Sequence, residues 1–305
     1  MEFIKNPDEE DKFIVVRTLT TRSSLQNSHV KGENASLFVT DDICFTVARV
    51  RSRERYYELQ WSFPEEIAFF SSLILGVHPD YGKIFIFPVR WPFYLEDTGQ
   101  DLSKEEFLIK VAGKIKAEIS SSLETSNYLN NREFLPAKFI DASYKYGNVG
   151  LSKDYRRFLF DKIDTENDLL IRGLSHLIKC GMLRQFGRMF FDTASLELYI
   201  SLEATLHIIQ ERLRQNGMQN PSNKDVSDYL LEKFGEPYRL DRYYEEFYDD
   251  RIKAVHPDSR FGKAMFVPHY VTDLYMLYND LMRNYEFLIT GKPKCYQEFE
   301  FSESL

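Results

Sequence analysis

The spacing of apolar residues changes near residue 150, and this change constrains the fold more than any other feature of the sequence. Before it, short β-branched and aromatic runs alternate with polar turn residues, a pattern typical of strands. These runs lie at 13–19, 35–40, 44–50, 56–63 and 83–89. After it, apolar residues recur with the helical period of 3.6, as at Leu170, Leu174 and Leu177. The expected fold is α+β, with a β-rich α+β domain over 1–150 followed by an all-helical bundle.

Two helices are expected inside the β-rich half. Pro64-Glu65-Glu66 places proline and acidic residues in a first helical turn, and that helix is expected to end near Gly76. Ser103 and Glu106 form an S-x-x-E pattern ahead of apolar residues at helical spacing, which predicts a capping box.

The second half predicts a bundle of about five helices. Two of them carry apolar stripes, and the second stripe stops at Asn216-Gly217. Pro221-Ser222-Asn223 precedes a shorter helix that Gly235-Glu236-Pro237 breaks. Further helices are expected from about 240 to 251 and over 271–288. The stripes consist of Leu170, Leu174, Leu177 and Ile178 in the first helix, and Leu198, Leu202, Leu206, Ile209 and Leu213 in the second.

Charge and composition limit the classes of function. With 47 acidic and 39 basic residues the net charge is −8, so a nucleic-acid site must be local and not a broad basic face. No apolar run is long enough to span a bilayer, and the acidic N-terminus does not resemble a secretory signal. We therefore expect a cytoplasmic protein with no membrane segment. Cys44, Cys180 and Cys295 are more than a hundred residues apart and are expected to be buried thiols.

Common catalytic motifs are missing from the sequence. It has no phosphate loop, no dinucleotide-binding glycine pattern, no H-E-x-x-H and no G-x-S-x-G. The six histidines are dispersed, so neither a metal nor a cofactor is expected. His176 and His207 lie inside helical patterns and are interpreted as satisfied packing residues outside any site.

The stretch 248–262 is dense in charge although it lies between two apolar-periodic segments of the helical half. Five residues of α-helix turn through about 500°, which would leave Arg251 and His256 roughly 140° apart around the axis. Pro257 disfavours the α conformation at His256. The helix is therefore expected to end there, so that the imidazole and the guanidinium share one edge.

This stretch resembles the R-x4-6-H signature of the HEPN superfamily, especially its branch related to abortive-infection proteins. The segment 198–206, which contains Leu202-Glu203-Ala204, is similar to the Leu-Glu-Ala-Leu helix that precedes the motif in such domains. The resemblance covers residues 164–291 and leaves 292–305 as a C-terminal tail. It implies an up-and-down helical bundle, usually a homodimer whose two motif edges meet across the two-fold axis. Arg22 and His29 also match the spacing, but they lie in a Ser/Asn-rich part of the β-rich half.

The resemblance implies metal-independent cleavage of RNA, in which the ribose 2′-hydroxyl attacks the neighbouring phosphorus and leaves a 2′,3′-cyclic phosphate. His256 is the candidate general acid or base, because histidine exchanges protons near neutral pH. Arg251 is the candidate for holding the phosphate oxygens. Arg260 is either a second phosphate contact or an exposed loop arginine. Glu203 either orients Arg251 or His256 or forms a structural ion pair.

Three hypotheses follow from the sequence. The first is an endoribonuclease, a toxin or antiviral defence effector, in which the N-terminal domain senses a trigger or selects the RNA and an antitoxin is a further candidate partner. The second is a non-catalytic HEPN module that dimerises or binds nucleotides or RNA. It is favoured by Ile252, where active members often have Asn, and by Pro257, where Gly is common. In the third, Arg251 forms a salt bridge, His256 caps a helix, and there is no site.

Overall fold

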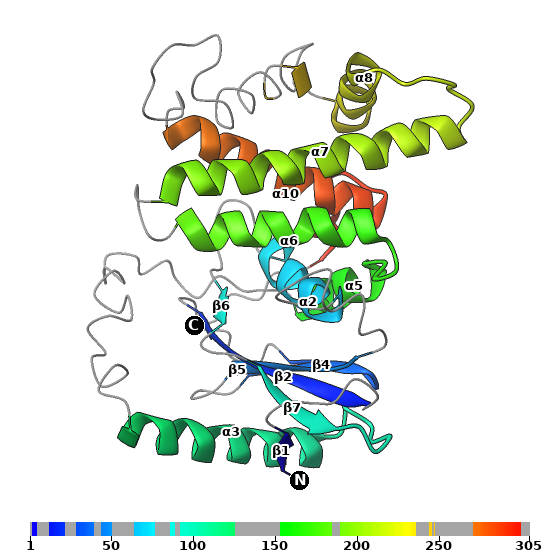
Figure 1. Ribbon diagram of the computed structural model, residues 1–305. Helices are drawn as coiled ribbons and strands as arrows, with labels where there is room; N and C mark the ends of the chain where they lie inside the picture. The colour runs from blue at the N-terminus through cyan, green and yellow to red at the C-terminus, as the bar shows by residue number, and fades with distance from the viewer. Residues whose placement is uncertain are drawn as a thin grey trace. The chain divides into compact units, whose positions relative to one another are not determined.

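The structure of the chain is a computed structural model. The chain divides into two compact units, Met1–Arg157 with Glu300–Leu305, and Phe158–Phe299. All described strands belong to the first unit, and the described regular structure of the second is helical, which confirms the expected α+β class (Figure 1). The described residues are 2–4, 12–21, 29–39, 44–50, 64–76, 86–88, 92–125, 153–184, 190–235, 244–245, 247 and 271–299.

An antiparallel sheet organises the first unit. Within the described residues it has seven strands in the order β1-β7-β2-β5-β4-β3, with β6 also paired to β2. The central strand is β2, where Val16 pairs with Val47 of β5 on one side and with Phe93 of β7 on the other. The strands are β1 (Phe3–Ile4), β2 (Phe13–Thr21), β3 (Val30–Lys31), β4 (Ala35–Val39), β5 (Cys44–Arg49), β6 (Ile86–Pro88) and β7 (Phe93–Glu96).

Three of the expected strands are confirmed, and a fourth is described only in part. The runs at 13–19, 35–40 and 44–50 form β2, β4 and β5. Within the run at 83–89, Ile86–Pro88 forms β6 and the other residues lie outside the described residues, as does the whole run at 56–63. The sequence patterns did not predict β1, β3 or β7, each of which has four residues or fewer.

Helices cover both faces of the sheet. The helices are α2 (Pro64–Leu75) and α3 (Glu105–Thr125), and Figure 1 shows them on opposite sides of the strands. Ile14 and Val16 of β2 belong to one buried cluster with Val111 of α3. On the alternate face of β2, Arg17 Nε lies 2.5 Å from Glu66 Oε1 of α2. Because successive side chains of a strand point to opposite faces, β2 is buried on both sides.

The starts of these two helices test the capping predictions. The helix predicted at Pro64 is confirmed, and it is followed by a turn at Gly76. The capping box predicted at Ser103 is wrong, because Ser103 Oγ and its backbone N–H both donate to Asp101 Oδ1, at 2.6 and 2.9 Å. Asp101 thus competes for the serine, and α3 begins two residues later, at Glu105.

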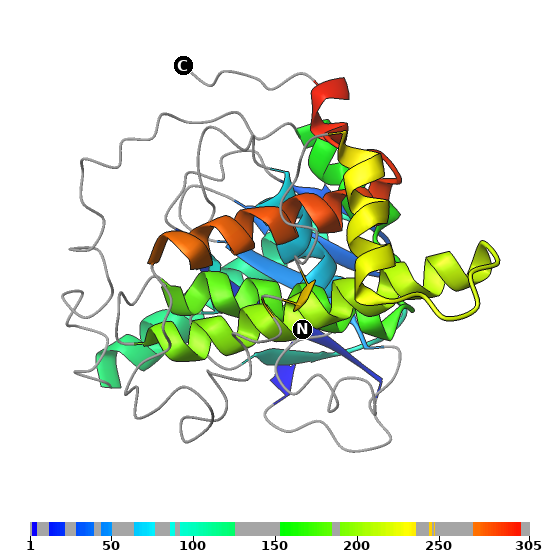
Figure 2. The same cartoon turned by 90° about the horizontal axis from the view of Figure 1, so that it is seen from above.

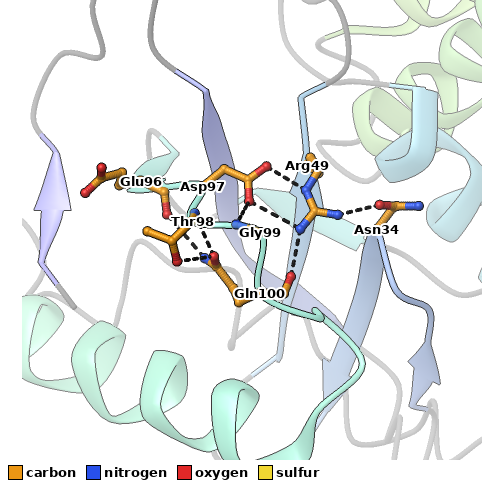
Figure 3. A network of polar contacts seen from close by, with 7 residues as sticks. All are labelled: Asn34, Arg49, Glu96, Asp97, Thr98, Gly99 and Gln100. Atoms are coloured by element: carbon orange, nitrogen blue, oxygen red, sulfur yellow. Dashed lines mark hydrogen bonds and ion pairs between the residues drawn. The ribbon is translucent and has the colours of Figure 1, made fainter.

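Arg49 at the end of β5 fixes the loop that leads into α3 (Figure 3). Its Nε and Nη2 donate to the two carboxylate oxygens of Asp97, at 2.6 and 3.2 Å, and Nη2 also donates to the carbonyl of Gln100 at 2.7 Å. Its Nη1 donates to Asn34 Oδ1 at 2.5 Å. Burial opposes ionisation of Asp97, but the bonds from Arg49 and from the N–H of Gly99 outweigh it and lower the pKa of the carboxyl. Every nitrogen of the Arg49 guanidinium is therefore hydrogen-bonded.

The described regular structure of the second unit is helical, and three of its helices pack along one another. Figures 1 and 2 show α6, α7 and α10 side by side. None of the described helices is both long enough and apolar enough to cross a membrane. The helices are α5 (Lys153–Lys162, which crosses the boundary between the units), α6 (Asp168–Leu183), α7 (Phe191–Gln215), α8 (Asn223–Phe234) and α10 (Val271–Thr290), followed by the 3-10 turn η3 (Cys295–Glu298).

Four of the expected helices correspond to α6, α7, α8 and α10, whereas α5 was not anticipated. The helix expected over about 240–251 lies largely outside the described residues, which include helical backbone only at Tyr244–Glu245 and Phe247. Residues 292–299, expected as part of a tail, belong to the second unit, where Cys295 is buried and Lys292 pairs with Glu298 at 2.9 Å.

Local capping explains why the ends of α7 and α8 follow the sequence so closely. Gly217 adopts φ +98°, and the N–H of Met218 reaches back to the carbonyl of Leu213 at 3.0 Å, as in a Schellman motif. Ser222 caps α8 in a reciprocal capping box with Asp225. The helix boundaries predicted at 216–217 and 221–223 are confirmed.

Two hydrogen bonds and a close approach at Gly173 hold α6, α7 and α10 together. The hydroxyl of Tyr285 donates to the carbonyl oxygen of Ser201, and Ser201 Oγ donates to the carbonyl oxygen of Gly173, both at 2.9 Å. A Cβ at Gly173 would lie 2.1 Å from the Tyr285 hydroxyl and 2.7 Å from the Cβ of Ala204. Close approach of the three helices therefore requires glycine at this position.

Candidate functional site

The residues at the centre of the sequence prediction, Arg251, His256 and Arg260, lie outside the described residues, as do Ile252 and Pro257. Glu203 is the member of the predicted site that the structure describes. Within the described residues, Glu203 and its neighbours define the candidate site.

Glu203 lies on α7 at the edge of the buried stripe. Its sequence neighbours Leu202 and Ala204 are buried, whereas Glu203 is half-buried. Of the stripe predicted for α7, Leu206 is only half-buried, because it faces a pocket. The other four stripe residues, Leu198, Leu202, Ile209 and Leu213, are buried as predicted.

A pocket of about 220 Å³ lies beside Glu203. Binding sites for drug-sized ligands occupy roughly 300–1,000 Å³, so this pocket suits one small chemical group. Helix α7 supplies most of its lining, α8 supplies one residue, and the segment that follows α8 supplies two. The lining residues are Tyr199, Leu202, Glu203, Leu206, His207, Gln210, Asn223, Tyr244 and Phe247.

His207 lies one helical turn from Glu203 and presents a polar ring to this pocket. Gln210 Nε2 donates to the carbonyl of Pro221 at 3.2 Å, so its Oε1 is the atom that faces His207 Nδ1, also at 3.2 Å. An amide oxygen only accepts, and the proton of a neutral ring therefore lies on Nδ1. The lone pair is left on Nε2, which can accept a hydrogen bond.

The packing interpretation of His207 is wrong, because the side chain is exposed at the pocket. The i, i+4 spacing between Glu203 and His207 was the sequence signal that could have placed both on one rim. His176 does behave as interpreted: it is half-buried, and its Nδ1 lies 2.5 Å from Glu197 Oε2.

Tyr244 anchors the segment that completes the pocket. Thr205 Oγ1 donates to the carbonyl of Leu202 at 2.7 Å, so the Tyr244 hydroxyl is the donor in its 3.2 Å contact with Thr205 Oγ1. Burial raises the pKa of Tyr244 above its ordinary value. The neutral, buried phenol ties this segment to α7 and places Phe247 at the pocket.

The described residues contain no group of three or more His, Cys, Asp or Glu side chains placed to hold a metal ion. Cys180 and Cys295 are both buried cysteines. Comparisons of the chain with known protein families, with curated proteins and with solved structures found no match.

Proposed function

We propose that the protein is a metal-independent HEPN-type endoribonuclease in which Arg251 and His256 act on an RNA phosphodiester that occupies the pocket beside Glu203. The observation that supports this proposal is the shared position of Glu203 and Phe247 in one pocket. Arg251 follows Phe247 by four residues, and four residues span at most roughly 14 Å. This length of chain allows a long arginine side chain at that position to reach the Glu203 carboxylate.

The residues would divide the reaction between them. His256 exchanges the proton of the 2′-hydroxyl or of the leaving oxygen, and Arg251 holds the non-bridging oxygens as negative charge accumulates on them. Glu203 is a positioning residue, because an ionised carboxylate accepts hydrogen bonds and can orient a guanidinium or an imidazole N–H. Arg260 would add a second phosphate contact.

The proposal extends to the cellular role. The described lining of the pocket contains no Lys or Arg, so the proposal assigns the phosphate contacts to Arg251 and Arg260, which keeps the RNA site local in a chain of net charge −8. We place the protein in the cytoplasm as a homodimeric toxin or antiviral defence effector, with an antitoxin as a candidate partner. The first unit would sense the trigger or select the RNA.

The test is incubation of the purified full chain with single-stranded RNA in excess chelator, comparing the wild type with Arg251→Ala and His256→Ala. The proposal predicts fragments ending in 2′,3′-cyclic phosphate from the wild type only, and no cleavage of the same sequence made with deoxyribose, which lacks the 2′-hydroxyl. Equal cleavage by all three proteins would contradict it. If all three bind RNA as dimers without cutting it, the non-catalytic HEPN module is the better description.

A further inference from the structure

Arg184, the residue that ends α6, is a buried cation with unusual surroundings. Its exposed fraction is 9%, and its guanidinium carbon lies 3.8 Å from the ring centroid of Tyr275 and 4.6 Å from that of Tyr278, both on α10. In the part of the chain that the structure describes, none of its three side-chain nitrogens has a hydrogen-bond partner. All three are also closed to water.

This arrangement leaves a specific chemical deficit. Arginine remains charged at any ordinary pH and carries five N–H donors in one plane. An aromatic ring at 3.8 Å attracts the cation through its face, but it does not accept the hydrogen bonds that point outward in the guanidinium plane. Burial of a charge without such acceptors is costly. An in-plane acceptor with two oxygens is the missing partner.

Arg49 shows how this chain satisfies a guanidinium when no ligand is needed. Its nitrogens meet a carboxylate, an amide oxygen and a backbone carbonyl in the first unit. Arg184 has the same donors, is more deeply buried, and has aromatic rings where Arg49 has oxygens.

The two tyrosines beside Arg184 differ in their exposure to solvent, and this difference indicates from which side a ligand would approach the guanidinium. Tyr278 is buried, and its hydroxyl would lie 2.9 Å from a Cβ at Gly181, so the glycine admits the ring against α6. Tyr275, one turn earlier on α10, is 40% exposed. Tyr278 is thus the fixed wall, and Tyr275 is the side chain that can turn to expose the guanidinium.

We propose that Arg184, Tyr275 and Tyr278 form a binding site for a phosphate-type oxyanion, which pairs bidentately with the guanidinium plane when the ring of Tyr275 turns outward. The site is closed in this structure. The inference rests on Arg184 alone and is independent of the proposed ribonuclease activity.

The test is calorimetric titration of the full chain with inorganic phosphate at constant ionic strength set by chloride, together with melting curves in both salts. Arg184→Met removes the charge while keeping an unbranched side chain against the rings. Arg172→Met, an exposed arginine on the same helix, is the matched control for net charge. Adenosine monophosphate and a short RNA form two further arms, which distinguish free phosphate from a phosphate carried by a nucleotide or by RNA.

Saturable binding of phosphate and a rise in melting temperature over chloride are expected for the wild type and for R172M, and both should be lost in R184M. Arg184→Lys keeps the charge without the planar fork and should weaken binding at least tenfold, which decides the matter if R184M does not fold. An unchanged dissociation constant in R184K, or the same phosphate effect in R184M and the wild type, overturns the proposal. So does the absence of binding by the wild type in every arm.

Discussion

The hydroxyl of Tyr285 on α10 donates a hydrogen bond to the backbone carbonyl of Ser201 on α7, 2.9 Å away. Ser201 in turn donates to the carbonyl of Gly173 on α6, so one buried chain of polar contacts crosses three helices. Glu203 follows Ser201 by two residues on α7. The crossing therefore fixes the segment of α7 that carries Glu203.

Gly173→Ala should destabilise the protein, because the new methyl group would overlap the Tyr285 hydroxyl and the Cβ of Ala204. Overpacking of this kind costs about 1–3 kcal/mol in the free energy of unfolding, measurable by urea denaturation. Gly113→Ala on α3 is the matched control, since a Cβ there meets nothing within 4 Å and should be neutral or stabilising. Adding Tyr285→Phe to G173A should cost less than the sum of the two changes. Equal losses in G173A and G113A would refute this view of the crossing.

Asp97→Asn should remove stability in a pH-dependent way. The pKa of Asp97 is lowered in the folded protein, against an unfolded value of about 3.9. Its contribution is then fully present above that pH and is lost as the pH falls through the folded pKa. The free energy of unfolding of the wild type should exceed that of D97N by about 1–3 kcal/mol near neutral pH. This difference should narrow below about pH 4. Asn34→Ala is the control, because it removes a partner of Arg49 that does not titrate, and its loss of stability should not depend on pH in this range. A stability difference between the wild type and D97N that stays constant down to pH 2 would rule out the linkage.

Glu66→Gln should be among the most destabilising single changes in the first unit. Glu66 and Arg17 are both buried, and Thr46 Oγ1 donates to the same glutamate oxygen at 3.2 Å. Neutralising one member of a buried pair removes the opposite charge that compensates the other member, at a cost of about 3–5 kcal/mol. Glu106→Gln, an exposed first-turn residue of α3, should change stability by less than about 1 kcal/mol. Similar unfolding midpoints for E66Q and E106Q would show that the buried pair is not needed.

Glu203→Gln should slow RNA cleavage without lowering the melting temperature, because the proposed role is to orient the reacting groups. Misplacing a catalytic group by about 1 Å costs up to roughly 100-fold in rate. The pH profile of the cleavage rate should also shift, because a neutral amide no longer holds the positive charge of Arg251 or of protonated His256. Glu211→Gln, an exposed glutamate two turns along α7, should leave both rate and profile unchanged. A loss of melting temperature in E203Q with an unchanged pH profile would instead indicate a structural ion pair.

Sequence reasoning succeeded where the signal was local. Asn216-Gly217 and Ser222 mark helix ends through hydrogen bonds within a few residues, so the bounds of α7 and α8 could be predicted. Strand β7 could not, since its four residues are fixed by pairing with a strand about eighty residues earlier, as Phe93 is with Val16. The pattern at Ser103 misled because Asp101 takes its hydroxyl first.

The candidate site was predicted only in part for the same reason. Glu203 was identified from its Leu-Glu-Ala context, and the structure places it at a pocket. The pocket itself depends on the hydrogen bond between Tyr244 and Thr205. These residues are thirty-nine positions apart, so the spacing of apolar residues does not predict their contact. His207 is exposed at this pocket, whereas its apolar neighbours on the helix had indicated a packing residue.

The central claim is that the motif at Arg251 and His256, and no other match to its spacing, carries an RNA-cleaving site. The most direct measurement is the rate of RNA cleavage in excess chelator by His256→Ala and by His29→Ala, which alters the second match to the R-x4-6-H pattern, at Arg22 and His29. General acid–base groups contribute about 10²–10⁴-fold, so H256A should lose at least 100-fold while H29A keeps the wild-type rate. A wild-type rate in H256A, or no chelator-resistant cleavage by the wild type, would contradict the account.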